Sequence, residues 1–296
     1  MPSFLLHSSA VERLAETGAN LPAPMARALS EDLEYARFGA LLPDLPWLEG
    51  VKGGLSPFLE AQGAPHFARL LHQKAPVAVG LKLAELVASG ALVGRHPGLA
   101  VVCGYFTHLC LDRALHPVVD RLVEIHRRRE ETEEQAHRRI EWTQALFYLR
   151  EMHGRDLIGT SFVRSKLQLS KSRLPTRGIG RGLYELVRLA LQDSLEEAPP
   201  KEQVDAWMRG AFVYGVLLST RVGTRQATPA YSTLALRELY RGDGLDFPAE
   251  VERAVADARG VLTRVYRFME RGSFTPRSRQ RFLEDFPEGP VARFAA

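Results

Sequence analysis

Apolar residues recur at three- and four-residue spacing through most of this chain, and that period constrains the fold more than any other feature. Ala and Leu are frequent in the periodic segments and β-branched runs are rare, which favours helices. Short breaks containing Pro and Gly, such as LPAP at 21–24, separate the segments. We therefore expect an all-α protein with helices at 8–18, 23–40, 66–91, 98–124, 131–152, 182–195, 201–220, 231–240, 248–270 and 276–284.

The start of the chain and its hydropathy indicate the compartment. The opening MPSFLLHSSAVERLAE has a histidine and charges where a secretory signal needs a long apolar stretch. No run of apolar residues is long enough for a transmembrane helix. Cys103 and Cys110 are seven apart on a predicted helix, about 10 Å at the helical rise, which is too far for a disulfide. We expect a cytoplasmic protein with two buried thiols.

The histidines divide the chain into two parts. All nine histidines lie within the first 153 residues, and none follows His153. With 296 residues, 45% of them apolar, the chain can bury a sizeable core. We expect a metal-binding helical core over 1–160 and a C-terminal helical extension over 161–296 that packs on it.

Three ionisable residues are four apart in GYFTHLCLDRALHPVVD: His108, Asp112 and His116. On a helix this spacing places them on one face over two turns. A carboxylate buried between two imidazoles in so apolar a segment is costly unless a divalent cation compensates it. A surface His–Asp pair is the simpler alternative, but the third residue and the apolar surroundings favour a metal site.

A second pair, His137 and Glu141, lies one turn apart in AHRRIEW. Alone it would be a solvated helix pair. If the two helices form an antiparallel hairpin, however, the pair meets His116 and supplies a three-ligand site with room for water.

Upstream candidates are less specific. His7 lies at the front of the first predicted helix, and Asp44 lies in the turn LLPDLP, where a simple turn or capping role is equally consistent with the local sequence. His66 and His72 compete for one more ligand position.

The ordered motifs resemble the bacterial zinc-dependent phospholipase C family, whose helical fold is shared in outline with P1-type single-strand nucleases. MPSFLLH, FGALLPD, LLHQKAP, GYFTHLCLDRALHP and AHRRIE follow one another over roughly residues 1–150. The resemblance implies a helical bundle of that type with two or three Zn²⁺ ions and a phosphoester substrate, such as a phospholipid with its head group.

The resemblance also implies a ligand set. Asp44, His72, His108 and Asp112 would surround one ion, and His116, His137 and Glu141 a second, with Asp112 and His7 sharing a third. Asp44 would also act as general base. Secreted family members complete the third site with the amino group of an N-terminal tryptophan, which this chain lacks, and His72 fits the intracellular pattern better than His66.

The acid-free segment RSKLQLSKSRLPTRGIGR at 164–181 is the candidate for substrate binding. Within it, Arg177 and Arg181 could contact a phosphate. A solvated basic loop is the alternative, because a net charge of +4 does not by itself imply nucleic acid.

Three functions remain open at this point. The first is a zinc-dependent phospholipase C-like hydrolase. The second is a single-strand nuclease or nucleotidase, which needs aromatic platforms for bases; Tyr105, Phe106, Trp142 and Phe147 are the available ones. The third is a helical binding module with structural metal. We expect no stable nucleic-acid binding.

Overall fold

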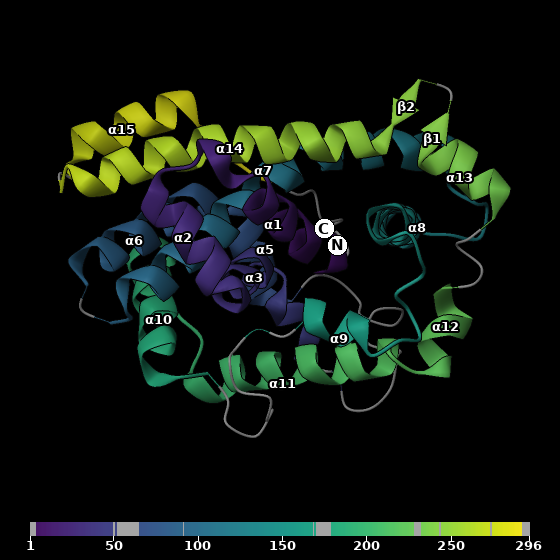
Figure 1. Cartoon of the computed structure of the whole chain (residues 1–296), viewed down its shortest axis with the longest axis horizontal. Coiled ribbons are helices and arrows are strands. Elements are labelled where there is room, and N and C mark those ends of the chain that lie inside the picture. Colours follow the sequence, from purple (N-terminus) through teal and green to yellow (C-terminus); the bar gives the residue numbers. More distant parts are fainter. Residues whose placement is uncertain are drawn as a thin grey trace.

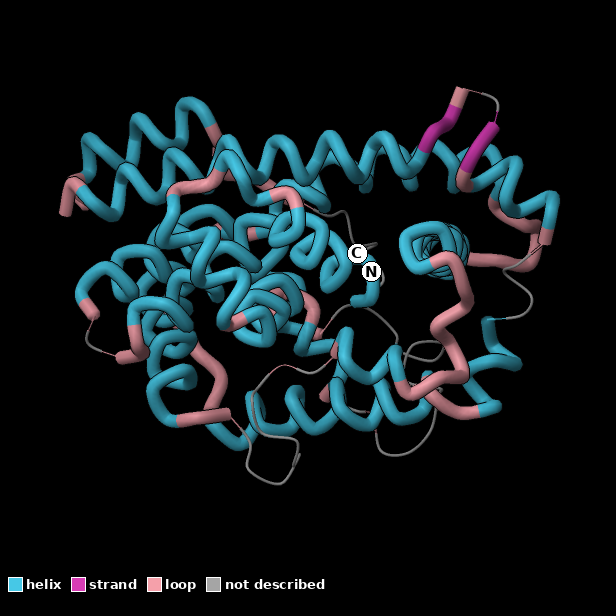
Figure 2. Tube along the Cα trace, in the orientation of Figure 1, coloured by secondary structure: helices cyan, strands magenta, loops and turns pink. Residues whose placement is uncertain are grey.

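The computed structural model shows a chain built almost entirely from helices (Figures 1 and 2). It describes residues 4–49, 51, 65–90, 92–167, 169, 179–227, 232–242, 244–272 and 274–291. Within these residues the β structure is one antiparallel hairpin, β1 (Arg241–Gly242) and β2 (Leu245–Asp246). The all-α expectation is confirmed.

The first part of the chain carries the helices that surround the histidines. They are α1 (Phe4–Glu16), α2 (Ala23–Glu31), α3 (Leu33–Leu41), α5 (His66–Gln73), α6 (Pro76–Ser89), α7 (Arg95–His126) and α8 (Glu133–His153), with short 3₁₀ turns η1 (Gly18–Asn20) and η2 (Leu45–Leu48). The second part contains α9 (Phe162–Lys166), α10 (Arg181–Leu195), α11 (Lys201–Leu218), α12 (Arg221–Ala227), α13 (Thr233–Leu239), α14 (Phe247–Glu270) and α15 (Pro276–Asp285).

Two predicted helices, 23–40 and 66–91, are each two helices in the structure. Asp32 leaves the helical region between α2 and α3, with φ −131° and ψ 42°. Ala75 does the same between α5 and α6, because the proline that follows it disfavours the α conformation. The short helices α9 and α12 were not expected from the periodicity.

Helix α7 packs against α1, α2, α3, α6, α8 and α14. The backbone of α3 comes especially close to it. A Cβ on Gly104 would lie 1.9 Å from the carbonyl oxygen of Ala36, and a Cβ on Gly39 would lie 2.1 Å from that of Val101. The two glycines therefore permit backbone contact between the helices. This close approach brings the end of α3, and Asp44 after it, to the middle of α7.

The C-terminal helices cover the same core. α14 runs along α7 across the top of Figure 1, α10 packs on α6 and α11 packs on η2. Among the described residues, most buried apolar side chains of both parts belong to one continuous cluster, and a smaller second cluster joins α7 and α8 to α13 and β2. Cys103 and Cys110 are both buried and unpaired within the larger cluster. Within the described residues, none of the helices combines the length and apolar character that a membrane crossing requires.

A buried ion group fixes α1 against α3 and α9. Glu12 on α1 accepts a hydrogen bond of 2.7 Å from Arg37 on α3, and its other oxygen contacts the ammonium of Lys166 on α9. The Lys166 side chain is 3% exposed. His7 lies on the same helix, five residues before Glu12, so the ion group also holds the helix that carries His7.

Candidate metal centre

The face of α7 that carries His108, Asp112 and His116 is turned into the protein. His108 and Asp112 are fully buried and His116 is 5% exposed. His108 Nε2 lies 3.1 Å from Asp112 Oδ2, and His116 Nε2 lies 3.8 Å from Asp112 Oδ1. The four-residue spacing therefore places both imidazoles beside one carboxylate, as the sequence predicted.

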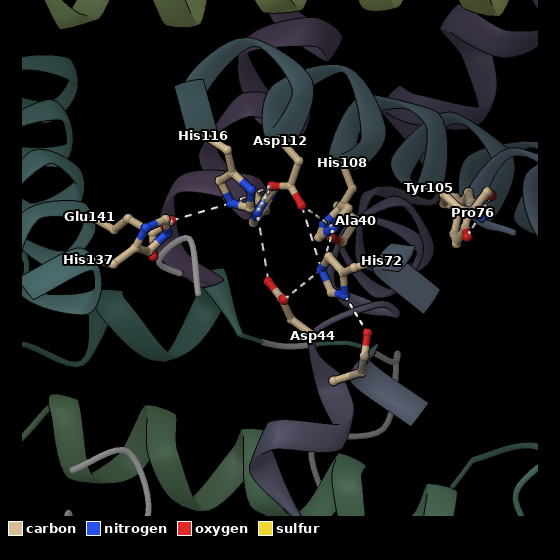
Figure 3. Close-up of polar contacts among 12 residues, drawn as sticks. Ala40, Asp44, His72, Pro76, Tyr105, His108, Asp112, His116, His137 and Glu141 are labelled. Carbon is tan, nitrogen blue, oxygen red and sulfur yellow. Dashed lines mark hydrogen bonds and ion pairs between the residues drawn. The ribbon is translucent and has the colours of Figure 1, made fainter. Parts of the chain in front are cut away.

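Residues from α1, α5 and the turn after α3 complete this group. Figure 3 shows Asp44 and His72 beside Asp112 and His108. His7 Nε2 lies 3.2 Å from Asp112 Oδ1 and 3.7 Å from Asp44 Oδ2. His72 Nε2 lies 3.3 Å from Asp44 Oδ1 and 3.5 Å from Asp112 Oδ2. All of these side chains are fully buried.

The α7–α8 hairpin adds a second group next to the first. Glu141 Oε1 lies 3.4 Å from His116 Nε2 and 2.9 Å from His137 Nε2. The His137 side chain is 12% exposed, so this end of the site lies nearest to solvent. The three residues meet as the proposed antiparallel hairpin required.

Backbone carbonyls set the orientation of two imidazoles. His72 Nδ1 donates to the carbonyl of Ala68 at 2.6 Å, and His108 Nδ1 donates to the carbonyl of Ala40 at 2.8 Å. Because a carbonyl accepts only, each ring carries its proton on Nδ1 and turns Nε2 toward the carboxylates. Backbone hydrogen bonds of this kind are typical of metal-binding histidines.

The resulting arrangement of acceptors fits a cation. The Nε2 atoms of His72 and His108 lie 3.3 Å apart and both face Asp112. Zinc bonds of about 2.0–2.1 Å in a tetrahedron separate neighbouring donor atoms by about 3.3 Å. His72 Nε2 lies 3.3 Å from Asp44 Oδ1, 3.3 Å from His108 Nε2 and 3.5 Å from Asp112 Oδ2, and His108 Nε2 lies 3.1 Å from Asp112 Oδ2.

Buried polar atoms without hydrogen-bond partners point to the same conclusion. Among the described residues they include both ring nitrogens of His7 and His116 and both carboxylate oxygens of Asp44 and Asp112. Leaving such groups buried and unsatisfied costs about 1–3 kcal/mol each. A divalent ion shared among them removes this cost. Among the described residues, three donor sets bring their ligand atoms within 4.8 Å of one another: His7, His108 and Asp112; Asp44, His72 and His108, which shares His108 with the first; and the separate set His116, His137 and Glu141.

Neighbouring groups of opposite charge shift the pKa values of the site. Burial alone would raise the pKa of Asp112, but the imidazoles of His108 and His116 hold it well below its usual range. Burial likewise opposes ionisation of Glu141, yet His137 lowers the pKa of that carboxyl. Burial disfavours the charged form of His137, but Glu141 and Asp120 outweigh it and raise its pKa to about 9.

The structure separates the remaining candidates. His66 is exposed and pairs with Glu197 at 2.8 Å, whereas His72 lies 3.3 Å from Asp44 in the buried group. Arg181 begins α10, where the next residue, Gly182, lies against the carbonyl of Leu92. From the start of α7 to His108 the helix rises about 20 Å, so Arg181 is not brought to the site. Arg177 lies outside the described residues.

The sequence interpretation missed Asp120. Its Oδ1 lies 3.3 Å from His137 Nδ1, so it orients the ring whose other nitrogen faces Glu141. A signal was present, because Asp120 continues the four-residue series of His108, Asp112 and His116 along α7.

A C-terminal strap, residues 286–291, was also missed. Glu288 accepts hydrogen bonds from the backbone N–H groups of Val77 and Ala78, at 2.8 and 2.9 Å. The N–H of Val291 donates to the carbonyl of His72 at 2.9 Å. These hydrogen bonds hold the strap against the end of α5, which carries His72, and against the start of α6. No local pattern in the sequence indicates this long-range contact.

Comparison with known proteins does not identify a family for this chain. No protein-family model matches the chain, and no match was found among curated proteins or solved structures. The resemblance to zinc-dependent phospholipases C therefore stays a prediction.

Proposed function

We propose that this protein is a metal-dependent phosphoester hydrolase, a phospholipase C-like phosphodiesterase that uses two or three Zn²⁺ ions. The observation that carries the proposal is the position of Asp112. One of its oxygens faces His7 and His116, and the other faces His72 and His108. One buried carboxylate thus joins adjacent donor sets, as in the multi-metal sites of phosphoesterases.

Different residues of the site would have different roles in such a reaction. His72 and His108, fixed by backbone carbonyls, hold their Nε2 atoms toward the donor set. Bound ions would lower the pKa of a water molecule and offset the charge of the phosphate. Asp44 is the candidate general base, because its two carboxylate oxygens are buried beside His7 and His72 and have no hydrogen-bond partner of their own.

Substrate would approach from the α8 side. The side chains of His137 and Asp120 are 12% and 31% exposed, whereas those of His7, Asp44 and His72 are fully buried. A phosphate reaching the site from solvent therefore meets the His116, His137 and Glu141 group first.

The nuclease alternative has less support. Tyr105 and Phe106 are fully buried, and Phe147 is 5% exposed. Trp142 is partly buried and packs against the apolar core. None of the four offers an open face on which a base could stack. A small phosphodiester substrate fits these observations better than a polynucleotide.

The test combines metal analysis with hydrolysis. Protein purified without chelator should contain two or three zinc ions per chain and should cleave bis(p-nitrophenyl) phosphate. Chelation should abolish activity and added Zn²⁺ should restore it. Asp112→Ala should lose both metal and activity, whereas Asp257→Asn, an exposed change on α14, should lose neither. Metal bound by a protein that cleaves none of a panel of lipid, nucleotide and nucleic-acid phosphoesters would favour a structural role instead.

A further inference from the structure

Two long stretches of the chain contain no acidic residue. Residues 157–184 contain six basic residues and residues 206–237 contain four, with no Asp or Glu in either. Together they carry a formal charge of +10, whereas the whole chain carries +4. The rest of the chain therefore carries a net formal charge of −6.

The structure packs the described parts of these stretches together. Helix α9 lies along the end of α11, where a Cβ on Gly215 would lie 3.5 Å from Leu167 and 3.7 Å from Arg164. The N–H of Gly159 donates to the carbonyl of Leu218 at 2.8 Å, and Gly159 abuts Thr224 on α12. α9, α11 and α12 thus form one continuous region, along the lower edge of Figure 1.

The same region exposes large apolar side chains. Six such side chains are exposed in the described part of the protein, and five of them lie in the two acid-free stretches. On α9, α11 and α12 they are Phe162, Phe212 and Val222, which are 48%, 39% and 47% exposed. Exposed apolar side chains of this size on three elements that pack together are what an interaction surface requires.

Arginines accompany these apolar side chains. Arg164, Arg209, Arg221 and Arg225 are exposed, and none forms an ion pair with a described carboxylate. The guanidinium of Arg155 lies 5.3 Å from the ring centroid of Phe162. Exposed cations that no acid neutralises attract an anionic partner.

We propose that this α9–α12 surface, formed by Phe162, Arg164, Arg209, Phe212, Arg221, Val222 and Arg225, docks the protein on an anionic phospholipid bilayer. Arginines bind the lipid phosphates while the apolar side chains enter the boundary between head groups and acyl chains. A nucleic acid would bind the arginines but would make no apolar contact that explains the exposed Val222. The proposal shares no residue with the metal centre and is independent of the proposed hydrolase activity.

Cosedimentation with lipid vesicles tests the proposal. We expect the full chain to bind phosphatidylcholine vesicles that contain phosphatidylglycerol, and not vesicles of phosphatidylcholine alone. Binding should weaken as salt increases. The triple variant Arg164→Gln, Arg221→Gln, Arg225→Gln should lose more than about tenfold in partitioning. Phe162→Ser with Val222→Ser should also weaken binding, while salt dependence persists.

A matched control separates this surface from net charge. The triple variant Arg271→Gln, Arg277→Gln, Arg281→Gln changes the charge equally at exposed positions on and beside α15, and it should bind vesicles like the unchanged protein. Equal loss in both triple variants would overturn the proposal, as would equal binding to neutral vesicles. The proposal would also be overturned if the protein bound a single-stranded oligonucleotide but did not bind vesicles.

Discussion

The carboxylate of Asp112 lies 3.2 Å from the imidazole of His7, although the two side chains come from different helices, α7 and α1. The other oxygen of Asp112 faces His72 and His108. Two donor sets therefore depend on one carboxylate, while the α7–α8 set depends on it less, because His116 Nε2 lies closer to Glu141 than to Asp112.

This difference predicts unequal effects of substitution on metal content. His116→Ala should remove the ion of the α7–α8 set and leave the ion held by Asp44, His72 and His108. Asp112→Asn should strongly weaken binding of the ion beside His72 and His108 and should weaken binding of the α7–α8 ion less, because only His116 of that set lies near Asp112. Equilibrium dialysis with elemental analysis measures the outcome. Equal metal loss in the two variants would contradict the separation into sets.

Metal binding should depend on pH through His137. In the metal-free protein its pKa is raised to about 9, so below that pH the ring is protonated. A metal ion binds the neutral imidazole and must displace this proton. Zinc affinity of the α7–α8 set should therefore rise about tenfold per pH unit up to pH 9 and then level off. Titration calorimetry in buffers of different ionisation enthalpy measures the released proton, and no proton release would contradict the prediction.

The Glu12–Lys166 pair should be sensitive to loss of one partner. Glu12→Gln leaves the ammonium of Lys166 buried without its carboxylate and should lower the free energy of unfolding by about 3–5 kcal/mol. Adding Lys166→Met should recover most of this loss, because the buried charge is removed. Denaturant unfolding of the single and double variants measures both steps. A double variant less stable than Glu12→Gln would contradict the explanation.

The strap should stabilise α6 and fix His72. Glu288→Ala removes two hydrogen bonds to the first turn of α6 and should cost about 1 kcal/mol, as the loss of a helix cap does. Amides of residues 66–80 should exchange faster with deuterium in the metal-free variant. Glu284→Ala, an exposed change on α15, is the matched control and should leave exchange unchanged.

The two cysteines should be chemically inert in the folded protein. Burial raises the pKa of both thiols, that of Cys110 to about 12. Because the thiolate is the reactive form, neither should react with Ellman's reagent until the protein unfolds, when two thiols per chain should titrate. Rapid reaction of either thiol under native conditions would show that the core opens there.

The helices and part of the site could be predicted because their signals are local. The apolar period predicts α7, and spacing alone places His108, Asp112 and His116 on one face of it. Asp44 has no such signal: it reaches the site because two glycines let α3 approach α7. His66 and His72 both lie on α5, about 240° apart around its axis, so they face different sides of the helix, and the local sequence does not tell which side is packed against the core. The placing of Arg181 at the site rested on charge and glycine content, and such composition carries no information about position.

The hydrogen bond from Val291 to the carbonyl of His72 also affects when the site can form during synthesis of the chain. During translation the ribosome makes His72, α5 and α6 long before it makes the strap that joins them. A newly made chain therefore presents Asp44, His108 and Asp112 before His72 is held in its final place. An ion captured at that stage would meet a looser set of ligands, so the centre matures only after Val291 has emerged.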